Sequence, residues 1–327
     1  MPERPYDLPL NTDPEVARIC DEMWEVGYSR VGSILNSEEA GLLKNTFGSM
    51  MGDCRPWSER WTEFGATQYL LPPFGDRDQI MFSNIAGRDK KADLLLEKIM
   101  TDRLVKGALT LLLGEGYKAW ELSARRSNAV DRGLRLHEDA IGEFGISVLL
   151  NDQYDAYGTT ALVPRSHRSK VRCREAGVED YLRPSFMRRF TDPVIGSAGD
   201  VYFFFKKTWH GRIKSIKNVS SDSLIFGLYP SGYRFKPFDI PMAYMNELPD
   251  ELKRLLRTDE GLVAQNDGYF IVQGDVRNDR IIDLIYRKEY SVSSVWGLGP
   301  YIKPSLDRAR SVYLGLRNYF RQVEAHT

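Results

Sequence analysis

Four short apolar runs between residues 145 and 230 constrain the fold more than any other feature of the chain. They are GISVLL (145–150), TTALVP (159–164), GDVYFFF (199–205) and SDSLIFGLYP (221–230). Val, Ile, Phe and Tyr are frequent in them, turn residues separate them, and no long helical pattern intervenes. This pattern predicts an antiparallel β-sandwich or β-barrel in the middle of the chain.

The segment before these runs is predicted to be mainly helical. DPEVARICDEMWEVG (13–27) indicates a helix with an aspartate cap and a proline in its first turn. Its apolar residues fall on one face: Val16, Ile19, Cys20, Met23 and Trp24. A short strand is predicted at 28–35 and a second helix from Ser37. KADLLLEKIMTDRLVKGALTLLLG (91–114) predicts one longer helix.

A change of pattern near residue 235 predicts two parts. Residues 1–235 are expected to form the β domain with its N-terminal helices, and residues 236–327 a mostly helical extension. Helices are predicted at 248–258 and 303–324, and the second carries an apolar seam. The seam consists of Leu306, Ala309, Tyr313, Leu316, Phe320 and Val323. It packs either on its own chain or across a homodimer, and both interpretations stay open.

Charge and composition exclude several classes of function. Lys plus Arg and Asp plus Glu both number 45, which gives no electrostatic case for a nucleic-acid partner. The longest apolar run is too short to cross a bilayer, and the first residues lack the apolar stretch of a signal peptide. The three cysteines lie far apart without a CxxC pair, which is typical of a reducing compartment. A cytoplasmic location is expected.

His137 and Asp139 form an HxD pair in a chain with only four histidines. On an extended segment, residues i and i+2 share a face, so both side chains can point at one ion. A third ligand must come from elsewhere, and His210 follows directly after an aromatic strand. Two histidines and one carboxylate form the facial triad of non-haem Fe(II) oxygenases. An isolated HxD is more often an ordinary hydrogen-bonded pair, so this pattern does not decide the matter.

The order of the motifs resembles the phytanoyl-CoA dioxygenase family of Fe(II)/2-oxoglutarate oxygenases. The stretches that carry the resemblance are WEVGYSRVGSILNSEEAGLLKNTF (24–47), LHED (136–139), YGTTALVPRSHR (157–168) and GSAGDVYFFFKKTWHG (196–211). Together they cover most of residues 24 to 230. The resemblance implies a double-stranded β-helix, which is a cupin-like jelly roll with a mainly β core and flanking helices.

The same resemblance assigns roles to individual residues. It implies that His137, Asp139 and His210 bind the iron, and that His167 is a structural turn residue. It further implies Fe(II) and 2-oxoglutarate as cofactors and dioxygen as cosubstrate. Apart from the resemblance, Trp209 and Tyr157 are the candidates for contact with the substrate, and ordinary packing is the alternative for both.

One departure from the family concerns the far carboxylate of 2-oxoglutarate. The family carries an arginine about a dozen residues past the distal histidine, but residues 218–232 contain none. A buried carboxylate needs a cationic or multi-donor partner. Arg212 is the first candidate, because it shares a strand face with His210, and Arg126, next to Arg125, is the second. Thr160 is a further candidate for cosubstrate binding. Alternatively, the cosubstrate is not 2-oxoglutarate, or it is not bound at all.

The expected function is therefore a dioxygenase that hydroxylates, or otherwise functionalises a C–H bond of, a small-molecule or natural-product intermediate in biosynthesis. The expected partner is that small molecule, with no nucleic acid and no membrane. The alternative is a non-catalytic β-helix binding domain with a vestigial or different metal site. Nothing in the sequence identifies the substrate.

Overall fold

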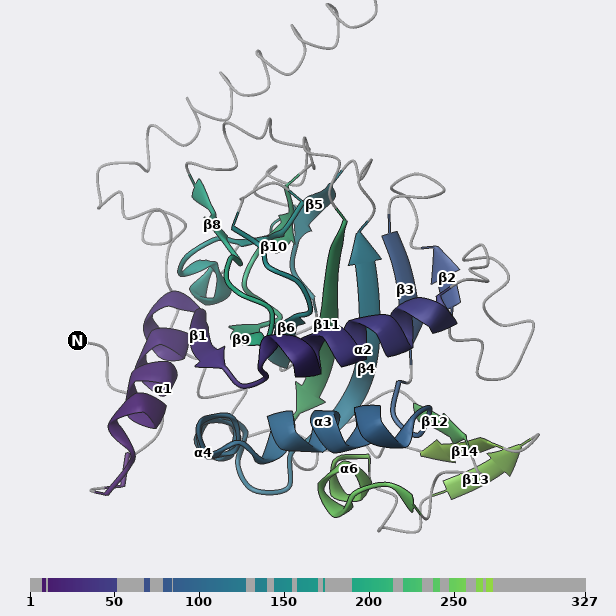
Figure 1. Ribbon diagram of the computed structural model, residues 1–327. Helices are drawn as coiled ribbons and strands as arrows, with labels where there is room; N and C mark the ends of the chain where they lie inside the picture. The colour runs from purple at the N-terminus through teal and green to yellow at the C-terminus, as the bar shows by residue number, and fades with distance from the viewer. Residues whose placement is uncertain are drawn as a thin grey trace, which may run out of the picture.

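The computed structural model describes an antiparallel β core with helices packed on one side (Figure 1). The described residues are 8–9, 11–51, 68–70, 79–83, 85–127, 133–139, 144–154, 158–169, 173, 190–213, 220–230, 238–241, 247–256, 263–266 and 269–272. The predicted seam after residue 303 lies outside them, so its packing and the homodimer stay predictions. Within the described ranges, no helix has the length and apolar character needed to span a bilayer.

The strands of the barrel alternate between two sheets along the chain. The large sheet has the order β1-β9-β6-β11-β4-β3-β2 and the small sheet the order β5-β10-β7-β8. Their bounds are β1 Tyr28–Ser33, β2 Gln68–Leu70, β3 Gln79–Ser83, β4 Lys118–Ser127, β5 Leu134–His137, β6 Phe144–Leu149, β7 Thr160–Leu162, β8 Asp192–Pro193, β9 Asp200–Phe205, β10 His210–Arg212 and β11 Ser221–Tyr229. From β4 to β11 the chain crosses repeatedly from one sheet to the other. This is a double-stranded β-helix, and the predicted fold class is confirmed.

The helices follow the predicted order, with one correction. They are α1 Pro14–Val26, α2 Ser37–Met50, α3 Lys90–Thr101, α4 Arg103–Leu113 and α6 Asp250–Leu255. All five apolar residues predicted for one face of α1 are buried. The prediction of a single helix over 91–114 was wrong. Asp102 ends α3 and caps α4 by accepting from the backbone N–H groups of Leu104 and Val105.

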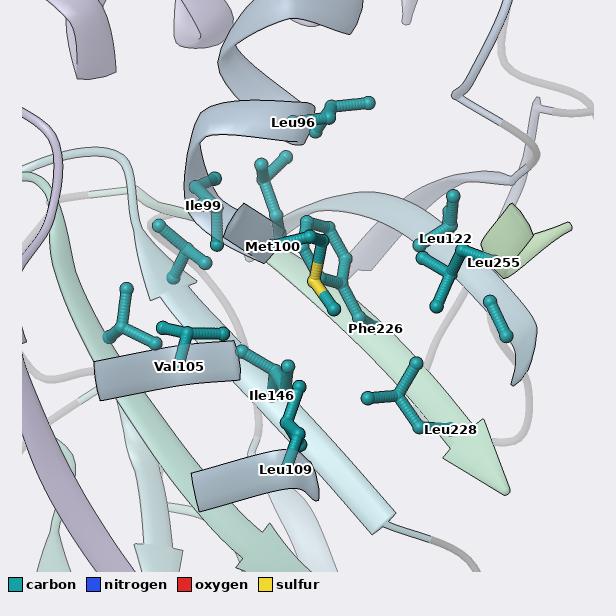
Figure 2. Packing of buried hydrophobic residues seen from close by; sticks show 14 of the residues in the cluster. Leu96, Ile99, Met100, Val105, Leu109, Leu122, Ile146, Phe226, Leu228 and Leu255 are labelled. Carbon is teal, nitrogen blue, oxygen red and sulfur yellow. The ribbon is translucent and has the colours of Figure 1, made fainter. Parts of the chain in front are cut away.

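The main core lies between one face of the large sheet and the helices. Leu122, Ile146 and Phe226 of three neighbouring strands pack against the apolar sides of α3, α4 and α6 (Figure 2). The other face of the large sheet looks into the barrel, where Tyr202 and Phe204 pack with Leu162 of the small sheet. The two faces of each central strand therefore have different environments, one under the helices and one inside the barrel.

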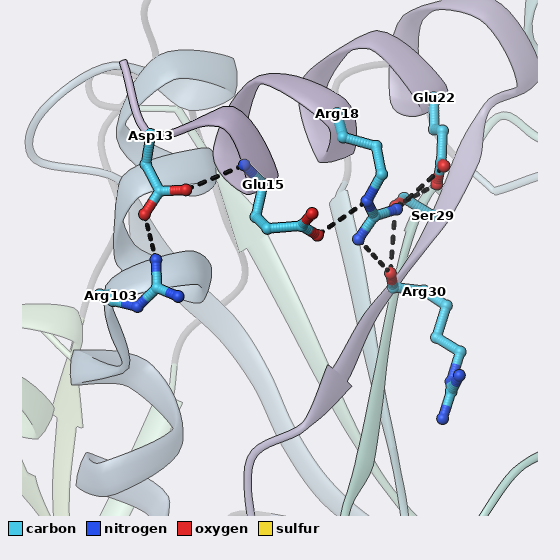
Figure 3. Close-up of polar contacts among 7 residues, drawn as sticks. All are labelled: Asp13, Glu15, Arg18, Glu22, Ser29, Arg30 and Arg103. Carbon is cyan, nitrogen blue, oxygen red and sulfur yellow. Dashed lines mark hydrogen bonds and ion pairs between the residues drawn. The ribbon is translucent and has the colours of Figure 1, made fainter. Parts of the chain in front are cut away.

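Polar contacts tie α1 to the elements beside it (Figure 3). Asp13 accepts from the backbone N–H of Glu15 and pairs with Arg103 of α4. Arg18 donates to the backbone oxygen of Arg30 in β1 at 3.2 Å. These contacts fix the N-terminal helix against the first strand of the large sheet.

The turn from α1 to β1 also contacts the middle of the chain. The backbone oxygen of Gly27 accepts from the N–H of Phe205 at 3.0 Å and from the Thr208 hydroxyl at 2.9 Å. Arg165 N–H donates to the oxygen of Val26 at 2.7 Å. Gly27 has a φ of 98°, and a Cβ there would lie 2.4 Å from a ring atom of His167. The turn therefore requires glycine on both counts.

The described residues of 236–327 include strands as well as a helix within the predicted range 248–258. A three-stranded sheet in the order β12-β14-β13 accompanies the one helix, α6. Its strands are β12 Phe238–Pro241, β13 Val263–Asn266 and β14 Tyr269–Val272. Leu252 and Leu255 of α6 belong to the main core. The domain boundary at residue 235 stays a prediction.

Candidate metal centre

His137, Asp139 and His210 converge at one end of the small sheet. His137 is the last residue of β5 and His210 the first of β10, and the two are direct partners in the antiparallel ladder. Their ring centroids are 4.2 Å apart. Asp139 follows two residues after His137, and one ligand atom from each residue lies within 4.8 Å of the others. Antiparallel pairing and the i, i+2 relation together bring the three side chains to one point.

The backbone orients His210 as a metal ligand. Its Nδ1 lies 2.7 Å from the backbone oxygen of Thr208. A carbonyl oxygen can only accept, so Nδ1 carries the proton and Nε2 of the neutral ring has a free lone pair. Nε2 lies 3.5 Å from Asp139 Oδ2, and His137 Nε2 lies 3.9 Å from Oδ1. This donor set fits a divalent metal of the Fe(II) type.

Asp139 is held in its charged form. Burial acts to raise its pKa, but Lys206, together with the two imidazoles when they are protonated, outweighs burial and keeps the pKa well below its usual range. Lys206 Nζ is 3.2 Å from Oδ2, and the backbone N–H of Asp139 donates to the Lys206 oxygen at 2.9 Å. A charged carboxylate with a fixed backbone is ready to bind a cation.

A buried charge network extends from Asp139 to β4. Lys206 Nζ is also 3.8 Å from Glu121 Oε2. Glu121 accepts from Arg125 at 2.6 Å and from the Ser123 hydroxyl at 2.8 Å. Burial acts to raise the pKa of Glu121, yet Arg125 and Lys206 hold it below its usual value. Glu121, Ser123 and Arg125 are spaced two residues apart in WELSARRS, which is the spacing of one strand face, but Arg126 beside them hides the pattern.

Arg125 and Arg126 point to opposite faces of β4. Arg126 forms a 2.6 Å ion pair with Asp222, on the face that α2 covers. A Cβ at Gly48 of α2 would lie 2.9 Å from the Arg126 guanidinium. Arg125 lies on the barrel face and is the ladder partner of Ser223 on β11. The second arginine candidate thus lies under the helices, and its neighbour faces the barrel.

The other predicted residues are found in different settings. Arg212 is buried on β10 and is the ladder partner of Thr160 on β7. Trp209 is fully buried and its Nε1 donates to Glu138 at 3.2 Å. Tyr157 lies outside the described residues. His167 is absent from the described metal-ligand cluster; its Nε2 lies 3.1 Å from the backbone oxygen of Trp24, and burial lowers its pKa to about 3.

Comparison with known proteins gives matches among solved structures alone. No family model matches the chain, and no curated protein matches it. EctD from S. alaskensis in its apoform is 19% identical, with a TM-score of 0.54 over 71% of this chain and 82% of EctD. SnoN, a non-heme alpha-ketoglutarate-dependent epimerase from nogalamycin biosynthesis, is 15% identical, with a TM-score of 0.52 over 80% of this chain and 100% of SnoN.

Some of the matched structures hold a metal ion, 2-oxoglutarate or both. HygX from Streptomyces hygroscopicus, with nickel and 2-oxoglutarate bound, is 15% identical, with a TM-score of 0.50 over 68% of this chain and 89% of HygX. EctD has also been solved with bound Fe and with 2-oxoglutarate and 5-hydroxyectoine. At these identities the likeness establishes the fold. The resemblance to Fe(II)/2-oxoglutarate oxygenases is confirmed at that level.

Proposed function

We propose that this protein is an Fe(II)- and 2-oxoglutarate-dependent oxygenase that oxidises a small molecule at a C–H bond. The observation that carries the proposal is the convergence of His137, Asp139 and His210 within 4.8 Å. The matched structures support it, because proteins of this fold hold Fe, or nickel with 2-oxoglutarate.

The three residues bind and orient the metal. Two imidazoles and one carboxylate would hold a divalent metal there, and this donor set suits Fe(II). Thr208 fixes the ring of His210, and Lys206 fixes the carboxylate of Asp139. Fe(II) bound there would supply the activation of dioxygen, with the 2-oxo acid as co-reductant. The protein contributes the coordination geometry, the positioning of the substrate and the exclusion of water.

Two arginines, Arg125 and Arg212, are candidates for binding the far carboxylate of the oxo acid. Arg125 is the partner of Ser223, close to where the family's arginine is expected on β11. Arg212 lies two residues past His210 and is paired with Thr160. Arg125 replaces Arg126 as the candidate from this wall, because Arg126 is held under α2 by Asp222. A guanidinium can bind a carboxylate through two parallel hydrogen bonds.

The proposed substrate is a small natural product or biosynthetic intermediate. EctD was solved with 5-hydroxyectoine, and SnoN comes from nogalamycin biosynthesis. Of the two predicted substrate contacts, Trp209 is fully buried, so its proposed role is to support the segment that carries His210. Hydroxylation, desaturation and ring formation all begin with oxidation of a C–H bond, and the residues at the centre suit each of them.

The test is anaerobic titration of 2-oxoglutarate into protein loaded with Fe(II). The proposal expects a metal-to-ligand charge-transfer band, followed by consumption of the oxo acid when oxygen is admitted. The matched control is Asp139→Ala, which should give neither. If wild-type protein gives no band at millimolar 2-oxoglutarate, the alternative of a β-helix binding domain with a vestigial or different metal site is favoured. The missing arginine in 218–232 is the sequence feature that favours that alternative.

A further inference from the structure

Lys206 places a buried ammonium group directly beside the metal-ligand cluster. The residue is 4% exposed, and its Nζ lies 3.2 Å from Asp139 and 3.8 Å from Glu121. The rings of Trp120 and Phe204 flank it, each with its centroid 5.6 Å from Nζ. A lysine is rarely buried unless it is paired, and here one of its two carboxylate partners is a candidate metal ligand.

The surroundings hold this ammonium in place. The Lys206 backbone oxygen accepts from Asp139 N–H, and the preceding residue, Phe205, donates to Gly27. On the far side, Glu121 is fixed by hydrogen bonds from Arg125 and the Ser123 hydroxyl. If the ammonium moved away from an incoming metal, it would lose its contact with Asp139 and its contacts with the rings of Trp120 and Phe204. The positive charge therefore stays near the metal when the metal binds.

We infer that Lys206 provides a permanent positive charge at the metal centre. This charge lowers the affinity of the site for a divalent cation and raises the affinity of the bound cation for an anionic ligand. This inference rests on the proposed function. Lys206 repels the metal and offsets part of the charge of Asp139, whereas it attracts the carboxylate of a bound 2-oxo acid. Lys206 and Glu121 are buried, so both effects are larger than they would be between groups in water.

The charge balance of the network favours a dianion. Arg125 and Lys206 carry two positive charges, and Glu121 and Asp139 carry two negative charges. A divalent metal adds an excess of two positive charges to this buried group. A dianionic oxo acid neutralises that excess, so metal and oxo acid are expected to strengthen each other's binding, and by linkage the coupling is reciprocal.

The experiment compares Lys206→Met with Lys207→Met. Lys207 is the adjacent lysine and interacts with Glu138, so its variant is the matched control. Co(II) alone is titrated into each metal-free protein under anaerobic conditions, followed by its visible spectrum, and 2-oxoglutarate is then titrated into the Co(II)-saturated protein. Lys206→Met should bind Co(II) about tenfold or more tightly and 2-oxoglutarate about tenfold or more weakly than wild type. Lys207→Met and the charge-conserving Lys206→Arg should stay close to wild type.

The opposite signs separate this role from a structural one. Damage to the fold would weaken both ligands, so a Lys206→Met protein that binds Co(II) no more tightly than wild type overturns the inference. Unchanged binding of 2-oxoglutarate also overturns it. Thermal unfolding of each apo-protein shows that the variants are folded, and Lys206→Gln replaces the methionine variant if that one is not. Wild-type protein that binds no Co(II) through the three ligands would overturn the proposed function as well.

Discussion

Arg125 and Arg126 are neighbours on β4, yet one faces the barrel and the other pairs with Asp222 under α2. The alternation of a strand is the whole cause of this difference. The two arginines have the same chemistry and different surroundings. Arg126 is therefore an internal control for the proposed role of Arg125 in binding the cosubstrate.

Arg125→Gln should raise the dissociation constant for 2-oxoglutarate roughly 30- to 1,000-fold, because a bidentate charged partner is lost. Arg126→Gln should leave that constant unchanged. It should instead lower the free energy of unfolding by on the order of 3 kcal/mol, since Asp222 stays buried without its closest cation. Anaerobic titration of the Fe(II) protein and urea denaturation measure the two quantities. Arg212→Gln is the third variant, and a large effect there with none at Arg125 would assign the carboxylate to β10.

Replacing His137, Asp139 or His210 singly by alanine should weaken Fe(II) binding more than about 100-fold, because two remaining ligands hold a labile divalent ion poorly. Calorimetric titration of Fe(II) under anaerobic conditions gives the affinity. His167→Ala, measured well below its unfolding temperature, should keep near wild-type affinity because His167 lies outside the cluster. Unchanged Fe(II) affinity in the His210→Ala protein would remove the basis for the metal site.

His167 should make the protein less stable as the pH falls below neutrality. Its pKa is about 3 in the folded protein, because of burial first and then the charge of Arg168, and near 6.5 when unfolded. Between about pH 6.5 and pH 3, His167 is therefore protonated in the unfolded chain and neutral in the folded chain. From this group alone, the free energy of unfolding should fall by about 2 kcal/mol between pH 7 and pH 5. Urea denaturation of wild type and His167→Gln across this range tests it, and equal slopes would contradict it.

Asp93 should have the opposite pH dependence. Its side chain is buried at the start of α3, where burial raises the pKa to about 6 despite the hydrogen bond from Gly87 N–H. The folded state thus holds a proton that the unfolded state releases at lower pH, and stability is lost as the pH rises through 6. Asp93→Asn keeps an acceptor for Gly87, so it should gain roughly 1–3 kcal/mol over wild type at pH 8 relative to pH 5. No gain at pH 8 would show that the carboxylate is not strained there.

Local patterns in the sequence were sufficient for most of the fold. The apolar face of α1, its aspartate cap and the strands β6, β7, β9 and β11 follow from spacings within ten residues or so. The error at 91–114 has a local cause too. The apolar periodicity continues through Thr101 and Asp102, whereas the backbone breaks there because Asp102 satisfies the first N–H groups of the next helix.

The predictable part of the site is the part that depends on strand alternation. His137 and Asp139 are two residues apart, and the antiparallel ladder then aligns His210 with His137. Glu121 and Lys206 could not be predicted, because their proximity to Asp139 depends on the register between β4, β9 and the end of β5. The choice between Arg125 and Arg126 likewise needed the phase of β4, which a run of two arginines does not reveal.

The hydrogen bonds that Gly27 receives from Phe205 and Thr208 have a consequence for synthesis of the chain. Gly27 and Thr208 are 181 residues apart. At the usual 5–20 residues per second, a ribosome needs roughly 10 to 40 s to travel from one to the other. During that interval the Gly27 oxygen lacks the hydrogen bonds from Phe205 and Thr208. The segment before His210 can therefore be fixed in place only after most of the barrel has been synthesised. Translation speed over residues 28–208 therefore sets the earliest moment at which a nascent chain can bring the three candidate metal ligands together.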